Sequence, residues 1–333
     1  MISRRLRSVS KGWWGRVIGV LLASTGPVAA VDVDCADGSG TVAVQCLDGT
    51  VATSCTTPTT SYISYYAVPS GSGPFPAVLY NHGGGGTALG GDPLENVGQL
   101  ACSGYLAHAK RRVLGPIELS YELEAAVGLD ELIALAGANL DPERVGVMGY
   151  SRGGLYALRM TELESGAFAA AVLMASAPGE GSWVDPGGDG STSMDSYLSD
   201  VGMIDPDTDF LVMVAGNDHN DTSGNNPFNH LVDLSTTVHQ TLIAQGLSST
   251  LEIRPAWPPL NLTLPLGGHQ LFESTDDGGQ VLGLDEEHYW RKVIEHFDTH
   301  LALPPAVPMP RLGGLMLGAC LVVVGIGVLR RGH

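Results

Sequence analysis

A serine set between glycines is the first feature of the sequence that could do chemistry. Residues 149–153, Gly-Tyr-Ser-Arg-Gly, form the pattern G-x-S-x-G between the apolar run "RVGVMGY" and a stretch with helical spacing. A sharp strand-to-helix turn strains the backbone at the serine, and glycines remove Cβ atoms that would clash as strand and helix approach. The hydroxyl is then held at the head of a sheet, at the positive end of a helix. The pattern predicts that Ser151 is a nucleophile.

A nucleophilic serine needs a base that takes its proton and an acid that orients the base, and candidates for both follow it in the chain. The preferred acid is Asp218, one short turn past the apolar run "DFLVMVAG", and Asp221 is the second choice. The preferred base is His269, in the glycine-flanked segment "PLGGHQLF". The other histidines after the serine fall on predicted helices or before the next strand: His219, His230, His239, His288, His296 and His300. The expected triad is Ser151, His269 and Asp218.

The oxyanion that forms on an attacked carbonyl needs hydrogen-bond donors, and a second glycine cluster offers them. The segment "YNHGGGG", residues 80–86, follows an apolar run and resembles the HGGG oxyanion turn of esterases and lipases. Glycine amides can point at one spot there, so we expect the amide of Gly83 or Gly84, together with that of Arg152, to form the hole. His82 is expected to pack and hydrogen-bond rather than to act as a base. A purely structural glycine turn is the alternative.

These residues need a scaffold, and the chain between them alternates apolar runs with helical patterns. Such alternation predicts a parallel sheet covered by helices. A loop rich in Gly, Ser and Asp at residues 177–197 follows one strand and is expected at the substrate rim. The expected strands lie at residues 75–82, 105–111, 144–150, 168–176, 209–216 and 249–256, and the expected helices at 121–137, 151–166, 229–246 and 285–301.

Both ends of the 333-residue chain look non-globular, which leaves room for one α/β domain between them. Residues 1–30 carry five Lys or Arg residues ahead of an apolar run and a small-residue site, the layout of a secretory signal peptide that is cut after Ala30. A retained membrane anchor is the alternative. We expect a cysteine-containing extension at 31–60, the α/β domain at 61–303, and a Pro-rich joint with a membrane anchor or sorting tail at 304–333.

The C-terminal tail combines a proline motif, an apolar run from Leu312 to Leu329, and two closing arginines. About eighteen apolar residues can span a bilayer, and the positive-inside bias would put those arginines in the cytoplasm with the domain outside. The layout resembles the PEP-CTERM sorting tails of exported proteins of Gram-negative bacteria, which implies a cell-envelope location and a sorting enzyme as a partner. Met309 stands where that motif has Glu, so a plain tail anchor is an equal alternative.

Charge argues against one class of partner. Eight of the 17 Lys and Arg residues lie in the two ends and no Asp or Glu does, which leaves 9 basic against 35 acidic residues and a net charge of −26 for the exported body. Such a surface repels phosphate backbones, so nucleic acid is not an expected partner.

Cysteine usage fits an oxidising compartment. Four cysteines there predict two disulfides with three possible pairings. Their spacings do not match a zinc site, because no CxxC occurs, and no HExxH is present. Asp185, Asp189 and Asp195 do not fit the spacing of an EF-hand loop and are expected to be solvated. We expect no metal and no cofactor. The four cysteines of the exported part are Cys35, Cys46, Cys55 and Cys102.

The motifs taken together carry a family resemblance. "PAVLYNHGGGG", "LDPERVGVMGYSRGG", "VAGND" and "GGHQLF" resemble the dienelactone-hydrolase and prolyl-oligopeptidase-like branch of the α/β-hydrolase superfamily, over about residues 61–303. The resemblance implies the α/β-hydrolase fold, with a mostly parallel sheet of about eight strands covered by helices on both faces. It also implies acyl transfer by a Ser-His-Asp triad without a cofactor. Dienelactone hydrolases are similar but use Cys where this chain has Ser151, which puts that substrate in doubt.

The expected reaction is hydrolysis through an acyl-enzyme. A small-molecule or lipid-like ester is the expected substrate, because the leaving group of an ester needs the least help. Two alternatives stay open. One is a serine peptidase of the prolyl-oligopeptidase type, although this length cannot hold the large propeller domain that those enzymes usually add. The other is a non-catalytic surface-binding protein on the same fold.

Overall fold

The computed structural model describes residues 30–48, 51–52, 55, 63–85, 88–90, 93–111, 121–176, 198–218, 231–255, 268–272, 283 and 288–302. The predicted signal peptide, apart from Ala30, and the predicted tail at 304–333 lie outside these residues, as do the loop at 177–197 and Asp221. Within the described ranges, no helix is long and apolar enough to cross a membrane.

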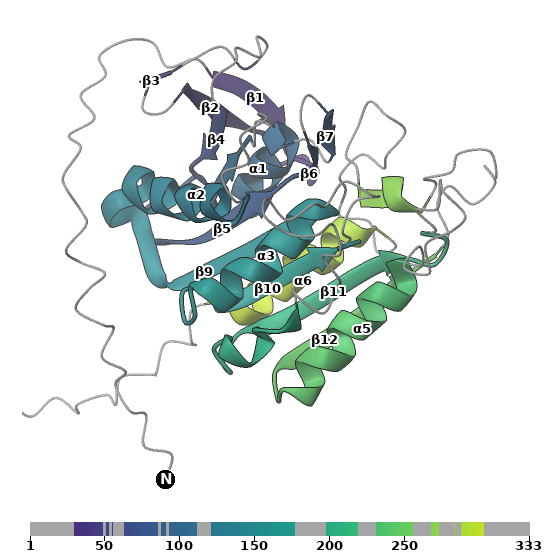
Figure 1. The fold of residues 1–333 in the computed structure, drawn as a ribbon. Helices are drawn as coiled ribbons and strands as arrows, with labels where there is room; N and C mark the ends of the chain where they lie inside the picture. The colour runs from purple at the N-terminus through teal and green to yellow at the C-terminus, as the bar shows by residue number, and fades with distance from the viewer. Residues whose placement is uncertain are drawn as a thin grey trace, which may run out of the picture. The chain divides into compact units, whose positions relative to one another are not determined.

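A ten-stranded sheet forms the centre of the described chain (Figure 1). Its strands are β1 (Ala30–Asp34), β2 (Thr41–Asp48), β3 (Val51–Ala52), β4 (Ile63–Ala67), β5 (Phe75–Asn81), β8 (Leu106–Lys110), β9 (Leu140–Tyr150), β10 (Ala170–Met174), β11 (Asp209–Ala215) and β12 (Ser248–Arg254). Nine of them follow the order β1-β2-β4-β8-β5-β9-β10-β11-β12, and β3 pairs with β2. The pairs from β8 through β12 in this order are parallel, whereas the pairs that involve β1, β2, β3 and β4 are antiparallel.

Helices cover both faces of the sheet, as the sequence predicts (Figure 1). Strand β10 shows why the sheet needs helices on both of its faces. Its alternate residues Ala170, Val172 and Met174 belong to one apolar cluster, and the intervening Ala171 and Leu173 belong to the other. A strand buried on both faces reads as a continuous apolar run, which is typical of parallel sheets. The first cluster is completed by α1 (Pro93–Cys102) and α6 (Tyr289–His300), and the second by α2 (Tyr121–Ala136), α3 (Arg152–Leu163) and α5 (Leu231–Ala244).

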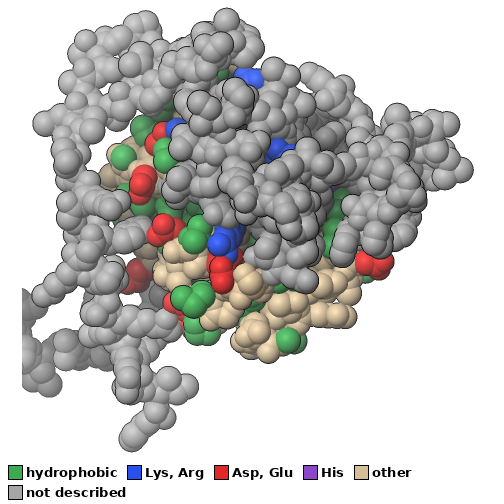
Figure 2. All heavy atoms as spheres, in the orientation of Figure 1, with side chains coloured by type: hydrophobic (Ala, Val, Ile, Leu, Met, Phe, Trp, Pro, Cys, Tyr) green, Lys and Arg blue, Asp and Glu red, His purple; other side chains and the backbone are tan. Residues whose placement is uncertain are grey.

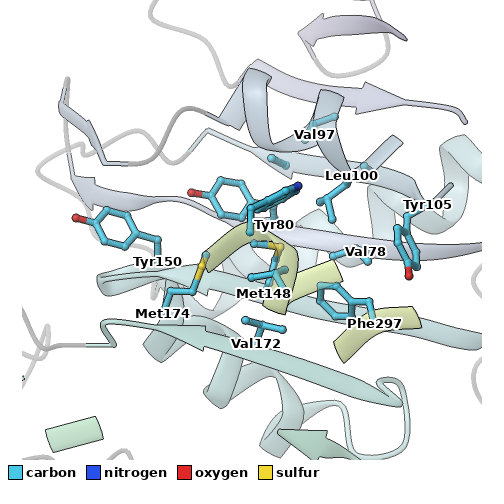
Figure 3. Packing of buried hydrophobic residues seen from close by; sticks show 14 of the residues in the cluster. Val78, Tyr80, Val97, Leu100, Tyr105, Met148, Tyr150, Val172, Met174 and Phe297 are labelled. Atoms are coloured by element: carbon cyan, nitrogen blue, oxygen red, sulfur yellow. The ribbon is translucent and has the colours of Figure 1, made fainter. Parts of the chain in front are cut away.

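Helix α6 closes the first cluster with an apolar stripe. Trp290, Val293, Ile294 and Phe297 follow the i, i+3, i+4, i+7 spacing of one helix face, and all are buried. A Cβ added to Gly146 of β9 would lie 2.7 Å from Cε1 of Phe297, so the ring packs directly on the strand backbone. Figure 3 shows Phe297 among side chains of β5, β9 and β10. Burial of each such side chain contributes roughly 1.5–3 kcal/mol, so α6 is firmly attached to the strand that leads to Ser151.

The cysteine-containing segment expected at 31–60 contributes β1, β2 and β3 to the sheet. The sheet therefore has ten strands, with nine on its main path, where the resemblance implies about eight. Two disulfides select one of the three possible pairings. The Cys35–Cys102 bond joins the end of β1 to the end of α1, and the Cys46–Cys55 bond links β2 to the chain just after β3.

Candidate active site

Ser151 lies at the turn between the end of β9 and the start of α3. Its backbone has φ 54° and ψ −121°, a conformation that L-residues with a side chain rarely adopt. Hydrogen bonds hold the turn: the Ser151 amide donates to the Met174 carbonyl at 2.8 Å, and the Gly154 amide donates to the Ser151 carbonyl at 3.0 Å. The serine thus has the strained backbone that the glycine pattern predicts.

The glycines around Ser151 stand where no Cβ atom fits. A Cβ added to Gly149 would lie 2.0 Å from the carbonyl oxygen of Gly153, so the strand and the helix approach each other in direct backbone contact. A Cβ added to Gly154 would lie 2.2 Å from Oγ of Ser176. These approaches explain why the sequence places glycine at both ends of the turn.

Three predicted residues meet in one hydrogen-bonded chain. The Ser151 hydroxyl donates to Nε2 of His269 at 2.9 Å, and the Nδ1–H of His269 donates to Oδ2 of Asp218 at 3.0 Å. The carboxylate that faces Nδ1 fixes this tautomer, since it can only accept. Asp218 is fully buried and His269 is buried, whereas Ser151 is half-buried. The serine end of this hydrogen-bonded chain thus reaches the surface, whereas the aspartate end is enclosed.

The carboxylate and the imidazole come from segments that pack directly on each other. Asp218 follows β11, and its amide donates to the Ala215 carbonyl at 3.0 Å. A Cβ added to Gly268 would lie 2.4 Å from the Asp218 nitrogen. The glycine before His269 is therefore required for the histidine segment to approach the aspartate turn. His269 itself opens a short 3-10 helix, His269–Phe272.

Tyr150, the residue before the nucleophile, also contacts the histidine. Its hydroxyl donates to the backbone carbonyl of His269 at 2.9 Å, and the two rings lie with centroids 5.0 Å apart. The sequence pattern gives no signal for this contact, because Tyr150 occupies a variable position of G-x-S-x-G. A second feature without a sequence signal is Ala175, which has φ 45° just past β10.

The glycine cluster expected at the oxyanion hole forms a small hairpin beside Ser151. Strands β6 (Gly83–Gly85) and β7 (Ala88–Gly90) pair antiparallel. A Cβ added to Gly83 would lie 3.1 Å from Cβ of Ser151, so the hairpin begins next to the nucleophile. His82 is fully buried, and its Nδ1 lies 2.7 Å from the Gly83 carbonyl oxygen. It is a packed, hydrogen-bonded residue, as expected.

Of the other histidines after the serine, those that the structure describes make different contacts. His288 accepts a hydrogen bond from the Trp290 amide and caps α6, and Nδ1 of His239 lies 2.9 Å from Oγ of Ser249. His296 and His300 lie one turn apart on α6, in an HxxxH spacing. His219 and His230 are outside the described residues.

The His296–His300 pair lies at the start of β11, so it is at the opposite end of that strand from Asp218. Nδ1 of His300 pairs with the Asp209 carboxylate at 3.0 Å, and Nε2 of His296 donates to the Asp209 carbonyl at 3.3 Å. Burial, and then the charge of His300, lower the pKa of His296 to about 4. Among the described residues, no group of three His, Cys, Asp or Glu side chains is arranged to hold a metal ion.

Sequence comparisons give no relative: no protein-family model matches this chain, and no curated protein does. Solved structures do match. A mutant of the esterase E40 is 15% identical with a TM-score of 0.52, over 83% of this chain and 87% of that one. An esterase from the bacterial hormone-sensitive lipase family is 14% identical with a TM-score of 0.50, over 78% and 85%.

An acylaminoacyl peptidase of Pyrococcus horikoshii is 15% identical with a TM-score of 0.50, over 71% of this chain. This chain spans only about two fifths of the length of the acylaminoacyl peptidases that it matches, between 38% and 41%. At these identities the likeness concerns the fold. Together with the sheet order and the helices on both faces, it shows that this chain has the α/β-hydrolase fold.

Proposed function

We propose that this chain is an exported serine hydrolase that cleaves carboxylic esters through an acyl-enzyme. The observation that supports the proposal is the chain of hydrogen bonds from Ser151 through His269 to Asp218, at 2.9 and 3.0 Å. Both distances lie within the reach that a nucleophile and its base need for proton transfer. The strained turn adds support, since it holds Oγ of Ser151 out of the backbone where a substrate carbonyl can approach.

The proposed reaction has two halves. In the first, Nε2 of His269 takes the proton of Ser151 as Oγ bonds to the ester carbonyl carbon, and then gives that proton to the leaving alkoxide as the ester bond breaks. In the second, His269 takes a proton from water as the water oxygen attacks the acyl group, and returns it to Oγ as the acid departs. The buried Asp218 carboxylate stabilises the imidazolium that exists between these transfers.

The pairing of β6 and β7 favours Gly84 over Gly83 as an oxyanion donor. Their register pairs Gly85 with Ala88 across a two-residue connection, and Gly84 with Leu89. Hydrogen-bonded and non-hydrogen-bonded pairs alternate, and the pair that closes such a connection is hydrogen-bonded. The Gly84 amide therefore points away from β7. We propose that it binds the oxyanion together with the amide of Arg152, which opens α3, where N–H groups point out of the helix end.

An ester substrate is favoured over a peptide by the extent of the structural likeness. The two esterases match this chain over most of both lengths. The peptidase likeness leaves more than half of that protein without a counterpart here. On the face that Figure 2 shows, the Lys and Arg side chains of the described residues lie apart from one another, so that face offers no cluster of cations for an anionic substrate. We therefore propose a small-molecule or lipid-like ester.

The test is hydrolysis of p-nitrophenyl esters from acetyl to palmitoyl by the purified protein and by Ser151→Ala. We expect hydrolysis that falls by at least about 10³-fold in the variant, and a chain-length profile that sizes the pocket. A fluorophosphonate probe should label the wild type and not the variant. Labelling without ester hydrolysis would point to a peptidase, to be tested with short peptide p-nitroanilides. A folded protein that is neither labelled nor active would be a non-catalytic binding protein.

Export is a separate part of the proposal, and it rests on the sequence of the two ends. We propose cleavage after Ala30 and attachment of the mature chain to the cell envelope through residues 304–333, with or without a sorting enzyme that acts on the tail. Fractionation of cells that express the full chain, with mass analysis of the product, tests this. A cytoplasmic product that keeps its first 30 residues would contradict it.

A further inference from the structure

We infer that Tyr150 is a positioning residue that holds His269 in register with Ser151 through its hydroxyl group. The inference rests on the proposed hydrolase function, but the contact that carries it is visible in the structure. The Tyr150 hydroxyl donates to the backbone carbonyl of His269 at 2.9 Å. The side chain is only 1% exposed, so this hydrogen bond is shielded from water.

The hydrogen bond from Tyr150 to His269 joins a central strand of the sheet to a short helix. Tyr150 is the last residue of β9, which pairs with β5 on one side and β10 on the other at the centre of the sheet. His269 is the first residue of a four-residue 3-10 helix, whose Leu271 amide donates to the Gly268 carbonyl at a long 3.3 Å. A hydrogen bond from the central strand therefore fixes the histidine backbone where local hydrogen bonding is weak.

The same side chain touches the other parts of the proposed site. It directly precedes Ser151, so the anchor and the nucleophile share a backbone. A Cβ added to Gly83 would lie 2.7 Å from Cδ1 of Tyr150, so the turn that begins β6 packs on the same ring. The imidazole of His269 lies over that ring with an interplanar angle of 38°. One tyrosine thus sets the spacing of nucleophile, base and oxyanion turn.

The ring and the hydroxyl of Tyr150 do different things. The ring belongs to the apolar cluster between the sheet and α6, and its centroid lies 6.3 Å from that of Phe272. A phenylalanine would fill that space equally well. Only the hydroxyl forms a hydrogen bond with His269, and in Figure 3 it points away from the other labelled side chains. Tyr150→Phe therefore removes the anchor and leaves the packing.

Tyr105 provides a matched control. It is buried in the same cluster, and its hydroxyl donates to Oδ1 of Asp298 at 2.5 Å. It lies just before β8, at the opposite end of the sheet from Ser151. Tyr105→Phe also removes one hydroxyl hydrogen bond, here to a part-buried carboxylate far from Ser151, so it reports the loss of stability alone.

The experiment compares the wild type, Tyr150→Phe and Tyr105→Phe on the best p-nitrophenyl ester. For Tyr150→Phe we expect kcat to fall about tenfold with KM within about twofold, because a misplaced base affects the chemical step more than binding. For Tyr105→Phe we expect wild-type kcat. Melting temperatures should fall by similar amounts in both. A kcat for Tyr150→Phe within twofold of the wild type would overturn the inference.

A second readout is independent of catalysis and separates failure of this inference from failure of the proposed function. Hydrogen exchange of the peptide that contains Gly268–Phe272 should be about fivefold faster in Tyr150→Phe than in the wild type, since one buried hydrogen bond restrains that segment. It should be unchanged in Tyr105→Phe. Equal exchange in all three proteins would show that the hydroxyl does not hold the segment, whether or not the wild type hydrolyses esters.

Discussion

A Cβ atom added to Gly153 would lie 1.9 Å from the carbonyl oxygen of Asn81. Asn81 is the last residue of β5 and Gly153 is the second residue of α3, so this approach brings the helix behind Ser151 against the strand that leads to the oxyanion hairpin. Both partners are backbone, and backbone cannot rotate away as a side chain can. The spacing of nucleophile and oxyanion turn therefore requires a residue without a Cβ atom at position 153, which only glycine provides.

Gly153→Ala should accordingly destabilise the fold and abolish ester hydrolysis. Overpacking costs roughly 1–3 kcal/mol where side chains can yield, and we expect at least the upper end here. Gly128→Ala is the control, because a Cβ there would lie 3.4 Å from Cδ1 of Leu79, an ordinary contact on helix α2. It should be neutral or stabilise by up to about 1 kcal/mol. Urea unfolding of both variants measures these changes in stability. A Gly153→Ala protein with wild-type stability would contradict the expected clash with Asn81.

The sequence is informative about the central strands and less so about the edge of the sheet. Strands β5, β10 and β11 are buried on both faces and appear as apolar runs, so local pattern locates them. Strands β1 and β2 alternate polar and apolar residues between turns and cysteines. Their place in the sheet is decided by the pairing of β2 with β4 and of β1 with β2, which are contacts between segments that no local pattern specifies.

The residues of the candidate site likewise fall into those that the sequence predicts and those that it does not. Ser151, Asp218 and His269 could be predicted because each lies at a turn with its own glycine or strand signal, in an order typical of the fold. Tyr150 could not, since its partner is the carbonyl of a residue 119 positions away. Ala175 could not either, because alanine is not a residue that usually marks a positive φ.

Asp218→Asn tests the choice between the two candidate acids. The amide of the asparagine can donate to Nδ1 of His269, which favours the wrong tautomer of the imidazole, and it cannot stabilise the imidazolium. We therefore expect kcat to fall by about 10³–10⁴-fold with little change in KM. Asp218, the first choice, is the residue whose Oδ2 lies 3.0 Å from Nδ1 of His269. Asp221→Asn is the matched control and should keep near wild-type kcat. If the Asp221 variant is the inactive one, the acid has been assigned to the wrong residue.

Backbone strain at Ala175 predicts a stabilising substitution. Its φ of 45° costs an L-residue roughly 1–2 kcal/mol, and glycine adopts this conformation freely. The gain is reduced by the greater freedom of glycine in the unfolded chain, about 0.4–1 kcal/mol, so Ala175→Gly should raise the free energy of unfolding by about 0.5 kcal/mol. Ala171→Gly in β10 is the control, and should lower it by about 1 kcal/mol. Loss of stability in the Ala175 variant would mean that its methyl group matters more than the strain.

The two disulfides should differ in what they contribute. Cys35–Cys102 spans 67 residues and Cys46–Cys55 spans 9. Loop-closure entropy gives about 4.4 kcal/mol for the longer loop and about 2.6 kcal/mol for the shorter. We expect the Cys35→Ser/Cys102→Ser protein to unfold at a lower urea concentration than Cys46→Ser/Cys55→Ser. The reverse order would show that the shorter bond supports the sheet edge by more than chain entropy.

Acid should weaken the fold first through a buried histidine. His296 has a pKa of about 4 in the folded chain, because burial and the charge of His300 disfavour its protonated form. In the unfolded chain it would titrate near 6.5, so the unfolded state binds more protons between these values. Stability is therefore complete above pH 6.5 and is lost as pH falls toward 4. A depression of this size corresponds to a loss on the order of 3 kcal/mol for this group.

The window between pH 6.5 and about 4.5 separates this effect from the titration of Glu131. Burial acts to raise the pKa of Glu131, but contacts with His108, Lys110 and Ser64 outweigh burial and lower the pKa to about 2, so it titrates at much lower pH. His108 is fully buried, its pKa is lowered chiefly by burial, and it adds to the histidine effect. His296→Gln should flatten the dependence of unfolding free energy on pH in this window. A slope that is unchanged in His296→Gln would assign the acid sensitivity to His108 instead.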